Sequence, residues 1–280
     1  MQVLHTLSQL QVWCSENGPI ALVPTMGNLH RGHTKLLEEA KNKTDAVLLS
    51  IFVNPTQFGE NEDFNTYPRT LETDLKKAEA VGSSAVFCPS VAELFPYERQ
   101  TVWVRHDLSS SYCGQFRPIF FRGIATVVTK LFHLSSPRWA FFGKKDFQQL
   151  VIIRQMVEQL NFPVEIIGVE TQRDPDGLAL ASRNQYLTPE ERKVAPQLQR
   201  ELKTIKQAIL GGAIDFRALC QQAVQRLSES GWEVDYIEVA HQHRLEPASP
   251  DDCELVILAA ARLGTTRLID NLDFQRTLPV

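Results

Sequence analysis

The segment 23–37, which reads VPTMGNLHRGHTKLL, constrains the fold more than any other part of the chain. An apolar run comes directly before it and predicts a buried strand. Pro24 fixes its own φ angle and Gly27 can take a positive one, so a tight turn follows the strand. His30 and His33 stand three residues apart, which places both rings on one face at the start of an amphipathic helix.

A strand, a turn and a helix N-terminus in this order predict a phosphate site. The first turn of a helix has unpaired backbone N–H groups and the positive end of the helix dipole. His30 and His33 add imidazole donors, whereas the Gly-Lys-Ser/Thr sequence of a P-loop is absent. The alternatives are a capping or core histidine pair and a two-histidine metal site. The metal site lacks a nearby acidic ligand.

Length and composition indicate a globular protein with one large and one small domain. The chain has 280 residues, of which 43% are hydrophobic and 22% are charged. Its net charge of −4, without a polybasic run, argues against general binding to nucleic acid or anionic membranes. We expect no membrane span and no signal peptide. The five cysteines are widely spaced, which predicts reduced, mostly buried thiols in a cytoplasmic protein.

Alternating strands and helices predict an α/β fold, a Rossmann-like doubly wound parallel sheet with ligands at the carboxyl ends of its strands. Strands are expected at 19–23, 46–53, 84–90, 139–143 and 163–170. Helices are expected at 3–15, 30–43, 70–81, 123–136 and 146–160. Residues 103–107 are also compatible with a strand, and residues 109–123 are expected to form a mobile loop. The run 46–53 is apolar throughout, as in a parallel strand covered on both faces.

After residue 185 the pattern changes to long helices followed by strand-like segments. Thr188, Pro189 and Glu191 form a good helix start with a capping box. Helical patterns cover 189–210 and 214–229, and strand-like segments cover 232–240, 254–264 and 265–274. We therefore divide the chain into a Rossmann-like domain, 1–185, and a smaller, lid-like C-terminal α+β domain, 186–280.

Polar motifs also follow the second expected strand. Asn54 and Gln57 carry amides that donate and accept, which suits a small substrate with hydroxyl and carboxylate groups. An Asx-Pro turn explains Asn54 about equally well. Tyr67 closes the same long polar loop, 54–70. Asp74 lies beyond it and would hold Mg²⁺ through water, with an exposed helix carboxylate as the simpler alternative.

Two later segments place charge at expected strand ends. Gly143 lets another backbone approach, and Lys145 can meet phosphate as a point charge. Asp146 begins the next helix, and Gln149 lies one turn further on the same helix face. The alternative is that this segment is a solvated part of the surface. In the loop GLALASRN, Ser182 can bond phosphate and Arg183 can neutralise a leaving group. This loop resembles the KMSKS-like loop of class I adenylating enzymes.

Together these strings resemble one family. His-Arg-Gly-His resembles the HxGH signature of the nucleotidyltransferase superfamily. PTMGNLHRGH, FVNPTQFG, YPRT, FRGIATVV, FFGKKDFQQL and DGLALASRNQYL are similar to the pantothenate synthetase family, in the same order over 24–183. The resemblance implies ATP-dependent joining of pantoate to β-alanine through a pantoyl-adenylate, with release of pyrophosphate and AMP. It also implies Mg²⁺, a homodimer and a cytoplasmic location.

The resemblance also implies roles for the residues that match the family's motifs. The expected ATP-binding residues are Pro24, Thr25, Met26, Gly27, His30, His33, Gly143, Lys145, Asp146, Leu180, Ser182 and Arg183. The expected pantoate-binding residues are Asn54, Gln57, Tyr67 and Gln149. The expected catalytic residues are His30, His33, Lys145, Ser182 and Arg183, and Asp74 is the candidate Mg²⁺ ligand. Catalysis would consist of positioning and charge stabilisation without a protein nucleophile.

Two positions depart from the family pattern, and two rival functions remain open. Ala181 stands where the family usually has serine, and Phe120 stands where it commonly has histidine. One rival is an HxGH nucleotidyltransferase acting on a phosphate ester, although the amides of Asn54 and Gln57 are neutral where that substrate needs cations. The other is a nucleotide-binding module without turnover. A short, acidic chain argues against an aminoacyl-tRNA ligase.

Overall fold

The computed structural model describes residues 1–60, 62–97 and 101–277, and the chain packs as two units. The first unit comprises Met1–Lys144 and Gln149–Glu170, and the second comprises Lys145–Gln148 and Thr171–Val280. This division falls after Glu170, earlier than the domain boundary expected at residue 185. The segment 171–185 therefore packs with the C-terminal helices and strands.

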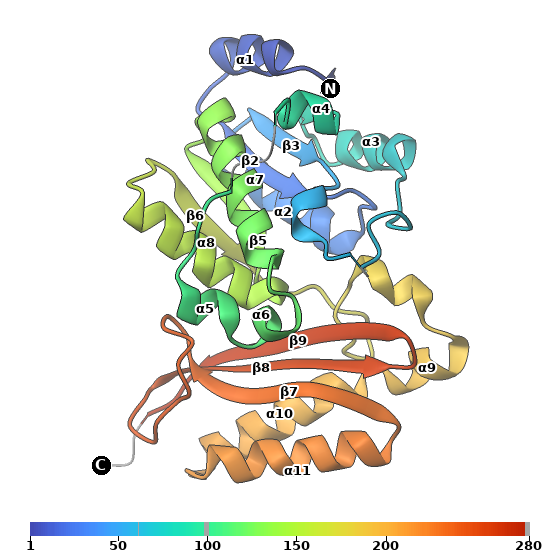
Figure 1. Ribbon diagram of the computed structural model, residues 1–280, viewed down its shortest axis with the longest axis vertical. Coiled ribbons are helices and arrows are strands. Elements are labelled where there is room, and N and C mark those ends of the chain that lie inside the picture. The colour runs from blue at the N-terminus through green and yellow to red at the C-terminus, as the bar shows by residue number, and fades with distance from the viewer. Residues whose placement is uncertain (61, 98–100, 278–280) are drawn as a thin grey trace. The chain divides into compact units, whose positions relative to one another are not determined.

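The first unit is built on a six-stranded parallel sheet (Figure 1). Its strands are β1 (Gln2–Leu4), β2 (Ala21–Thr25), β3 (Val47–Ile51), β4 (Ala85–Phe87), β5 (Trp139–Gly143) and β6 (Glu165–Val169). They lie in the order β1-β4-β3-β2-β5-β6, and each strand is parallel to its neighbours. The expected parallel sheet is confirmed.

Helices cover both faces of this sheet. They are α1 (Leu7–Glu16), α2 (Arg31–Lys41), α3 (Leu71–Ala80), α4 (Val91–Leu94), α5 (His106–Ser110), α6 (Cys113–Phe116), α7 (Phe120–Ser135) and α8 (Phe147–Gln159). Helix α2 packs on β2, β3 and β5, whereas α7 packs against α1 and the 3₁₀ turn η1 (Pro55–Gln57). Adjacent residues in β2, Leu22 and Val23, are both fully buried, so side chains on opposite faces of the sheet are covered.

Two segments of the first unit differ from expectation. A short edge strand, β1, precedes α1 within the expected helix 3–15. Only Leu4 of its three residues is buried, so the sequence of this strand shows no alternation of polar and apolar residues that would have predicted it. Residues 103–107 form no strand, because α5 begins at His106. The expected mobile loop 109–123 contains α6 and the first turn of α7.

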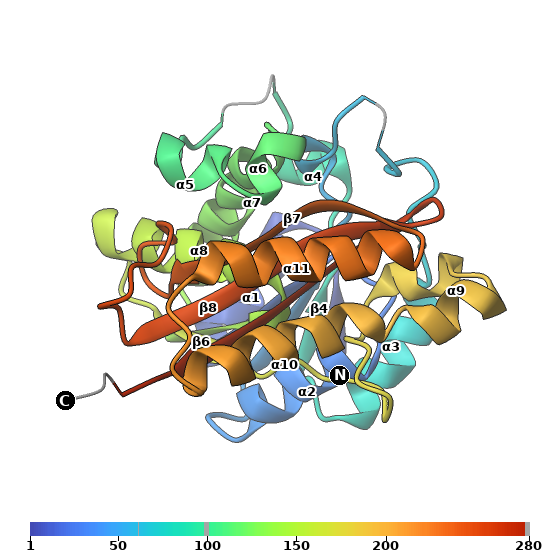
Figure 2. The same ribbon diagram turned by 90° about the horizontal axis from the view of Figure 1, so that it is seen from below.

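The second unit joins an antiparallel sheet to a layer of helices. The strands β7 (Trp232–His241), β8 (Glu254–Leu263) and β9 (Thr266–Gln275) pair in that order. The helices are α9 (Pro189–Val194), α10 (Gln197–Leu210) and α11 (Phe216–Glu229), after the 3₁₀ turn η3 (Ser182–Tyr186). Figures 1 and 2 show α10 and α11 side by side against one face of this sheet. The expected α+β architecture is confirmed.

The helix expected at 189–210 is divided in two. Helix α9 ends at Val194, and Pro196 is the N-cap of α10. Proline has no N–H to continue the hydrogen-bond ladder, which explains the break. The capping box at the start of α9 is present: the Thr188 hydroxyl accepts from the Glu191 backbone N–H, and the Glu191 carboxylate accepts from the Thr188 N–H.

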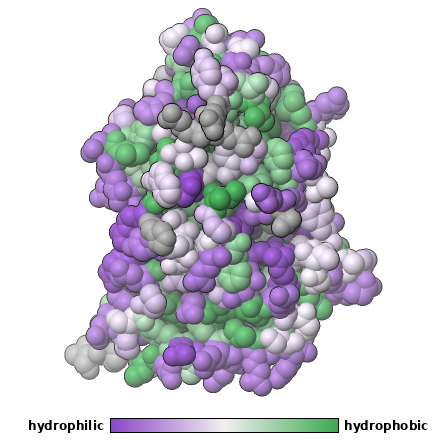
Figure 3. Space-filling model, viewed as in Figure 1, coloured by the Kyte–Doolittle hydropathy of each residue, from purple (hydrophilic) through white to green (hydrophobic). Residues whose placement is uncertain are grey.

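Figure 3 shows hydrophilic and hydrophobic side chains intermixed on the face that it presents. No helix among the described residues is both long and apolar enough to cross a membrane. All five cysteines are free thiols: Cys113 and Cys220 are buried, and Cys253 is exposed.

Cysteine reactivity follows from this burial. Burial raises the pKa of the Cys14 thiol to about 11 and that of the Cys220 thiol to about 12. The thiolate is the reactive form, so at pH 8 both groups stay protonated and unreactive. We expect iodoacetamide at pH 8 to modify exposed Cys253 at least about tenfold faster than Cys14 or Cys220, measured by peptide mass spectrometry. Equal rates in the folded protein would contradict this prediction.

Candidate functional site

The centre of the parallel sheet contains a point where the strand order reverses. After β2 the chain builds β3 and β4 on one side, and then β5 and β6 on the other. Strands β2 and β5 pair only at Ala21–Trp139 and Leu22–Ala140, so they separate toward their carboxyl ends. Such a separation forms the crevice in which ligands of doubly wound sheets bind. The predicted motifs after β2, β3 and β5 all begin at this edge.

The two histidines of the HxGH motif lie together at the start of α2. His30 is the N-cap, and His33 is the third residue of the helix. Their ring centroids are 4.1 Å apart. The Nδ1 of His30 accepts from the Gly32 N–H at 3.1 Å, and the Nδ1 of His33 accepts from the His30 N–H at 3.3 Å. The predicted placement of both rings at a helix N-terminus is confirmed.

These hydrogen bonds determine the tautomer of both rings. A nitrogen that accepts a backbone N–H carries no proton, so in the neutral ring the proton lies on Nε2. Each imidazole therefore offers an Nε2–H donor on the side away from the backbone. Gly32 is required beneath the first ring, because a Cβ there would lie 2.8 Å from Cε1 of His30.

The amides expected to bind substrate differ in their freedom to do so. The Asn54 side chain is buried and donates to Gln57 Oε1 at 3.0 Å and to the Gly123 carbonyl at 3.1 Å. Its Oδ1 accepts from the N–H and the hydroxyl of Thr56. All four hydrogen bonds of an amide are thus used within the protein. The structure gives Asn54 the role of holding Gln57, and its direct contact with pantoate stays a prediction.

Gln57 remains the amide with capacity for a ligand. Its Oε1 is held by Asn54, and its Nε2 lies 3.0 Å from the Met26 sulfur. An amide nitrogen has two N–H groups, so one further donor is available for a substrate oxygen. Gln57 thereby joins the turn after β3 to the turn after β2, which are the two strand ends next to the crevice.

Close packing of α7 on this turn depends on Gly123. A Cβ at Gly123 would lie 2.3 Å from the Thr56 carbonyl oxygen and 2.6 Å from the Gln57 nitrogen. No side chain fits there, so glycine allows the helix backbone to touch η1. The family string FRG contains this glycine, but its role depends on contact with Thr56 and Gln57, which are distant in sequence.

The loop 54–70 has a small core of its own, and Asn61 within it lies outside the described residues. Tyr67 is buried, with its ring edge-on to Phe58 at 5.9 Å. Arg117 pairs with Glu62 and donates to the Gln57 carbonyl at 3.3 Å. Tyr67, expected in the pantoate pocket, thus lies in a packed segment fastened to the backbone of Gln57.

Asp74 is a buried carboxylate, and not the exposed one of the simpler alternative. It is fully buried, and its oxygens accept from the N–H groups of Asn28 at 2.8 Å and Leu29 at 2.7 Å. The Thr70 hydroxyl donates to it at 3.1 Å. These hydrogen bonds join Asp74 to the turn after β2, and its water-mediated contact to Mg²⁺ stays a prediction. The described residues contain no group of three or more His, Cys, Asp or Glu side chains that could hold a metal.

The second unit contains the remaining predicted phosphate contacts. A tight turn, with Gly177 at φ 98°, brings the backbone of Leu180 against that of Gln172 at 2.9 Å. The segment then continues directly into η3, which begins with Ser182 and Arg183. The Asn184 side chain stabilises the segment between the turn and η3 by donating to the Ala179 carbonyl at 2.9 Å.

Buried polar residues of β9 hold both predicted phosphate segments of this unit. Asp270 accepts two hydrogen bonds from the Arg173 guanidinium, at 2.7 and 2.8 Å. The neighbouring Asn271 donates to the Lys145 carbonyl at 2.8 Å. The Lys145 ammonium lies 3.9 Å from the carboxylate of Asp146. Sequence reasoning missed Asp270 and Asn271, because they lie in a strand pattern without a recognisable motif.

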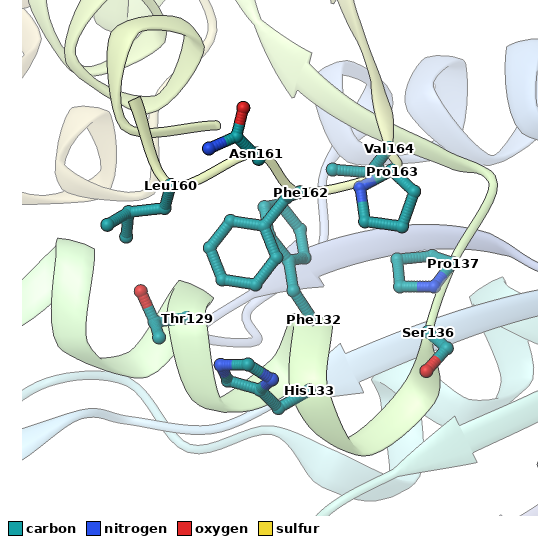
Figure 4. A pocket seen from close by; sticks show the side chains of 10 residues that line it. All are labelled: Thr129, Phe132, His133, Ser136, Pro137, Leu160, Asn161, Phe162, Pro163 and Val164. Carbon is teal, nitrogen blue, oxygen red and sulfur yellow. The ribbon is translucent and has the colours of Figure 1, made fainter. Parts of the chain in front are cut away.

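A half-open cavity of about 380 Å³ lies elsewhere in the first unit (Figure 4). The side chains of Phe132, His133 and Phe162 line it, at the end of α7 and before β6. This is the amino end of β6, opposite the edge where the HxGH motif lies. The cavity is therefore separate from the predicted site.

Comparison with known proteins assigns the family. The family model described as Pantoate-beta-alanine ligase matches residues 2–273. The pantothenate synthetase of Neisseria meningitidis serogroup B is 53% identical over 276 residues, which are 98% of this chain and 99% of the relative. The pantothenate synthetase of Chromobacterium violaceum is 49% identical over 99% of this chain and its own full length. The chain belongs to the pantoate-beta-alanine ligase family.

Solved structures of this family have the same fold. The pantothenate synthetase of Thermus thermophilus is 42% identical with a TM-score of 0.92, covering 98% of this chain and 99% of that one. The pantoate-beta-alanine ligase of Francisella tularensis is 30% identical with a TM-score of 0.81, covering 98% and 97%. That structure is described as complexed with β,γ-ATP and β-alanine.

The two departures from the family pattern have local explanations in the structure. Phe120, in place of the usual histidine, stacks beneath the Arg117 guanidinium, whose central carbon is 3.6 Å from the ring centroid. Phe120 therefore supports the arginine that contacts the Gln57 carbonyl. Ala181 is the N-cap of η3, and its carbonyl accepts from the Asn184 N–H at 3.0 Å. A hydroxyl at position 181 is not required for this turn.

Replacement of Gly123 tests the close packing around Gln57. Gly123→Ala favours the helix by about 1 kcal/mol in propensity, but its methyl group overlaps the Thr56 carbonyl. We expect a net loss of about 1–3 kcal/mol in the free energy of unfolding, measured in urea. Gly59→Ala is the matched control, since its Cβ would lie 3.6 Å from the nearest atom. A Gly123→Ala protein as stable as this control would contradict the packing argument.

Proposed function

We propose that this chain joins pantoate to β-alanine, using ATP and forming pantothenate through a pantoyl-adenylate. The observation that carries the proposal is the match of residues 2–273 to the pantoate-beta-alanine ligase family. The names of the relatives and the HxGH pair at the sheet edge agree with it. The product serves coenzyme A biosynthesis.

The proposed reaction has two steps. A carboxylate oxygen of pantoate attacks the α-phosphorus of ATP, and the bond to pyrophosphate breaks. The amine of β-alanine then attacks the activated carbonyl, AMP leaves, and the nitrogen loses a proton. The first step replaces oxide, a very poor leaving group, with AMP. No protein nucleophile is needed, so catalysis consists of orientation and charge stabilisation.

We assign the first step to the residues around the crevice. His30 and His33 would donate Nε2–H bonds to the α-phosphate oxygens, where charge builds up in the transition state. Pro24, Thr25, Met26 and Gly27 would line the same phosphate, as the family resemblance implies. Gln57 and Gln149 would orient pantoate, with Tyr67 in its pocket and Asn54 holding Gln57. Support comes from the tautomer of both rings and the hydrogen bonds of Gln57.

We assign stabilisation of the departing pyrophosphate to cationic and polar groups that follow β5 and β6 in sequence. Lys145, Ser182 and Arg183 are the proposed contacts, with Gly143, Asp146 and Leu180 as further nucleotide contacts. A fixed lysine is worth more than a mobile one, because it loses less freedom on binding. The bond from Asn271 to the Lys145 carbonyl supports this role.

Magnesium, a homodimer and a cytoplasmic location are further parts of the proposal. Mg²⁺ in nucleotide sites usually keeps several waters and takes few protein carboxylates, and it would neutralise phosphate charge here. The described residues fit an ion held mainly by the nucleotide, because Asp74 is occupied by backbone donors. Light scattering during size-exclusion chromatography would test the dimer.

The rival functions lose ground on specific observations. A phosphate-ester substrate needs fixed cations at the acceptor position, whereas Gln57, which we propose to contact the acceptor, carries a neutral amide. A module without turnover was suggested by Ala181 and Phe120. Both residues have local structural roles that leave the HxGH pair unchanged.

Exchange of labelled pyrophosphate into ATP tests the first step. With Mg²⁺ and pantoate but no β-alanine, we expect rapid exchange that depends on pantoate. Addition of β-alanine should then produce AMP and pantothenate in equal amounts. ATP binding without exchange under these conditions would contradict the proposed function.

Two adjacent lysines provide a matched comparison. Lys145→Ala should reduce turnover by about 10²–10³, as should His30→Ala, since each removes a donor to developing charge. Lys144→Ala should leave turnover within about twofold, because Lys144 pairs with Glu170 instead. Equal effects of the two lysine variants on turnover would contradict the assignment of Lys145.

A further inference from the structure

The turn before the HxGH helix has an unusual backbone. Gly27 has φ 86° and the next residue, Asn28, has φ 50°. Two successive residues therefore take left-handed conformations, and the second is not glycine. L-residues avoid this region unless surrounding contacts enforce it. His30 follows two residues later, so the direction of its ring depends on what holds this turn.

Asp74 supplies the contacts that hold the turn. Successive N–H groups in a turn converge and form a concave site for an anion. Here the N–H groups of Asn28 and Leu29 meet the two oxygens of one fully buried carboxylate, at 2.8 and 2.7 Å. A Cβ on Gly27 would lie 3.1 Å from the same carboxylate, so the turn and the carboxylate are in close contact.

Two neighbours on α3 complete the arrangement. Thr70 is the N-cap of α3, yet its side chain makes no capping bond and donates instead to Asp74. The hydroxyl is thus diverted from its usual role at a helix start. Lys77 donates to the Leu29 carbonyl at 2.5 Å. Residues 70, 74 and 77 are spaced so that they lie on one face of the helix.

We infer that Asp74, supported by Thr70 and Lys77, is a positioning residue for the HxGH motif. Asp74 accepts from the Leu29 N–H and Lys77 donates to the Leu29 carbonyl, so the two side chains together set the direction in which the chain enters α2. It thereby sets where the Nε2–H donors of His30 and His33 point. A carboxylate is needed because two N–H donors converge on it, and an amide offers only one acceptor. The kinetic part of this inference rests on the proposed function.

The test compares four variants of the full chain with the unsubstituted protein. Asp74→Asn keeps the shape but turns an NH₂ group toward a backbone N–H. Lys77→Met removes the contact to the Leu29 carbonyl, and Lys77→Arg should restore it. Glu72→Gln is the matched control, since it makes the same type of change at an exposed position of the same helix.

We expect Asp74→Asn to lower kcat of pantoate-dependent pyrophosphate exchange by about 10- to 100-fold. Lys77→Met should show a smaller loss, and Glu72→Gln none. The KM for pantoate and the half-saturating Mg²⁺ concentration should change by less than about twofold. A higher Mg²⁺ requirement with unchanged imidazole signals would show Asp74 to be a metal ligand and would overturn the inference.

Nitrogen-15 NMR of labelled histidine gives a readout that does not depend on activity. Signals of His30 and His33 are assigned with His30→Gln and His33→Gln. In the unsubstituted protein we expect the Nε2–H tautomer for both rings, and Asp74→Asn should shift these signals while Glu72→Gln does not. If exchange were absent in every protein, the proposed function would fail, and these spectra would still decide the positioning role.

Two results would overturn the inference directly. One is a folded Asp74→Asn protein with normal kcat. The other is a lowered kcat with unchanged imidazole signals. If Asp74→Asn fails to fold by circular dichroism, Lys77→Met and Thr70→Val decide instead. Normal kcat and normal imidazole signals in both would then reject the positioning role.

Discussion

The separation of β2 from β5 is the constraint on which the rest of the structure depends. The two central strands pair over only Ala21–Trp139 and Leu22–Ala140 and then diverge. Because all six strands are parallel, every connection that leaves the sheet beside this opening starts at the same edge. The HxGH turn, the Asn54–Gln57 turn and the Gly143 end are therefore neighbours through topology, although they are distant in sequence. These are the three segments to which we assign the ligand in the proposed function.

Polar residues around the predicted site divide into two kinds. Some carry an N–H that we propose to meet the ligand, as the two half-buried histidines and the buried Gln57 do. Others hydrogen-bond within the protein and hold neighbouring segments: Asn54 uses all four bonds of its amide and holds Gln57, and Asp74 accepts two bonds from the turn before His30. Burying a polar group is costly unless it is satisfied, so the saturated residues also contribute to stability. Orientation of the donors and stability of the fold therefore depend on the same hydrogen bonds.

The sequence was sufficient for features that are local and periodic. The strand at 139–143, the histidine pair and the capping box at Thr188 follow from adjacent residues, and the structure has them. Features that depend on distant partners were not predictable. In the sequence, Asp74 cannot be distinguished from any other carboxylate early in a helix. Its role follows only from its hydrogen bonds to the N–H groups of Asn28 and Leu29. The roles of Asp270 and Asn271 likewise follow only from their hydrogen bonds to Arg173 and Lys145. Strand β1 is defined only by its pairing with β4, which is distant in sequence.

The tautomer of the HxGH rings has a consequence for acid conditions. Each Nδ1 accepts a backbone N–H at the first turn of α2. A second proton on either imidazole would place two donors face to face, so protonation would break the bond that starts the helix. Loss of the neutral ring would therefore also loosen the N-terminus of α2, so the same hydrogen bonds orient the rings and begin the helix.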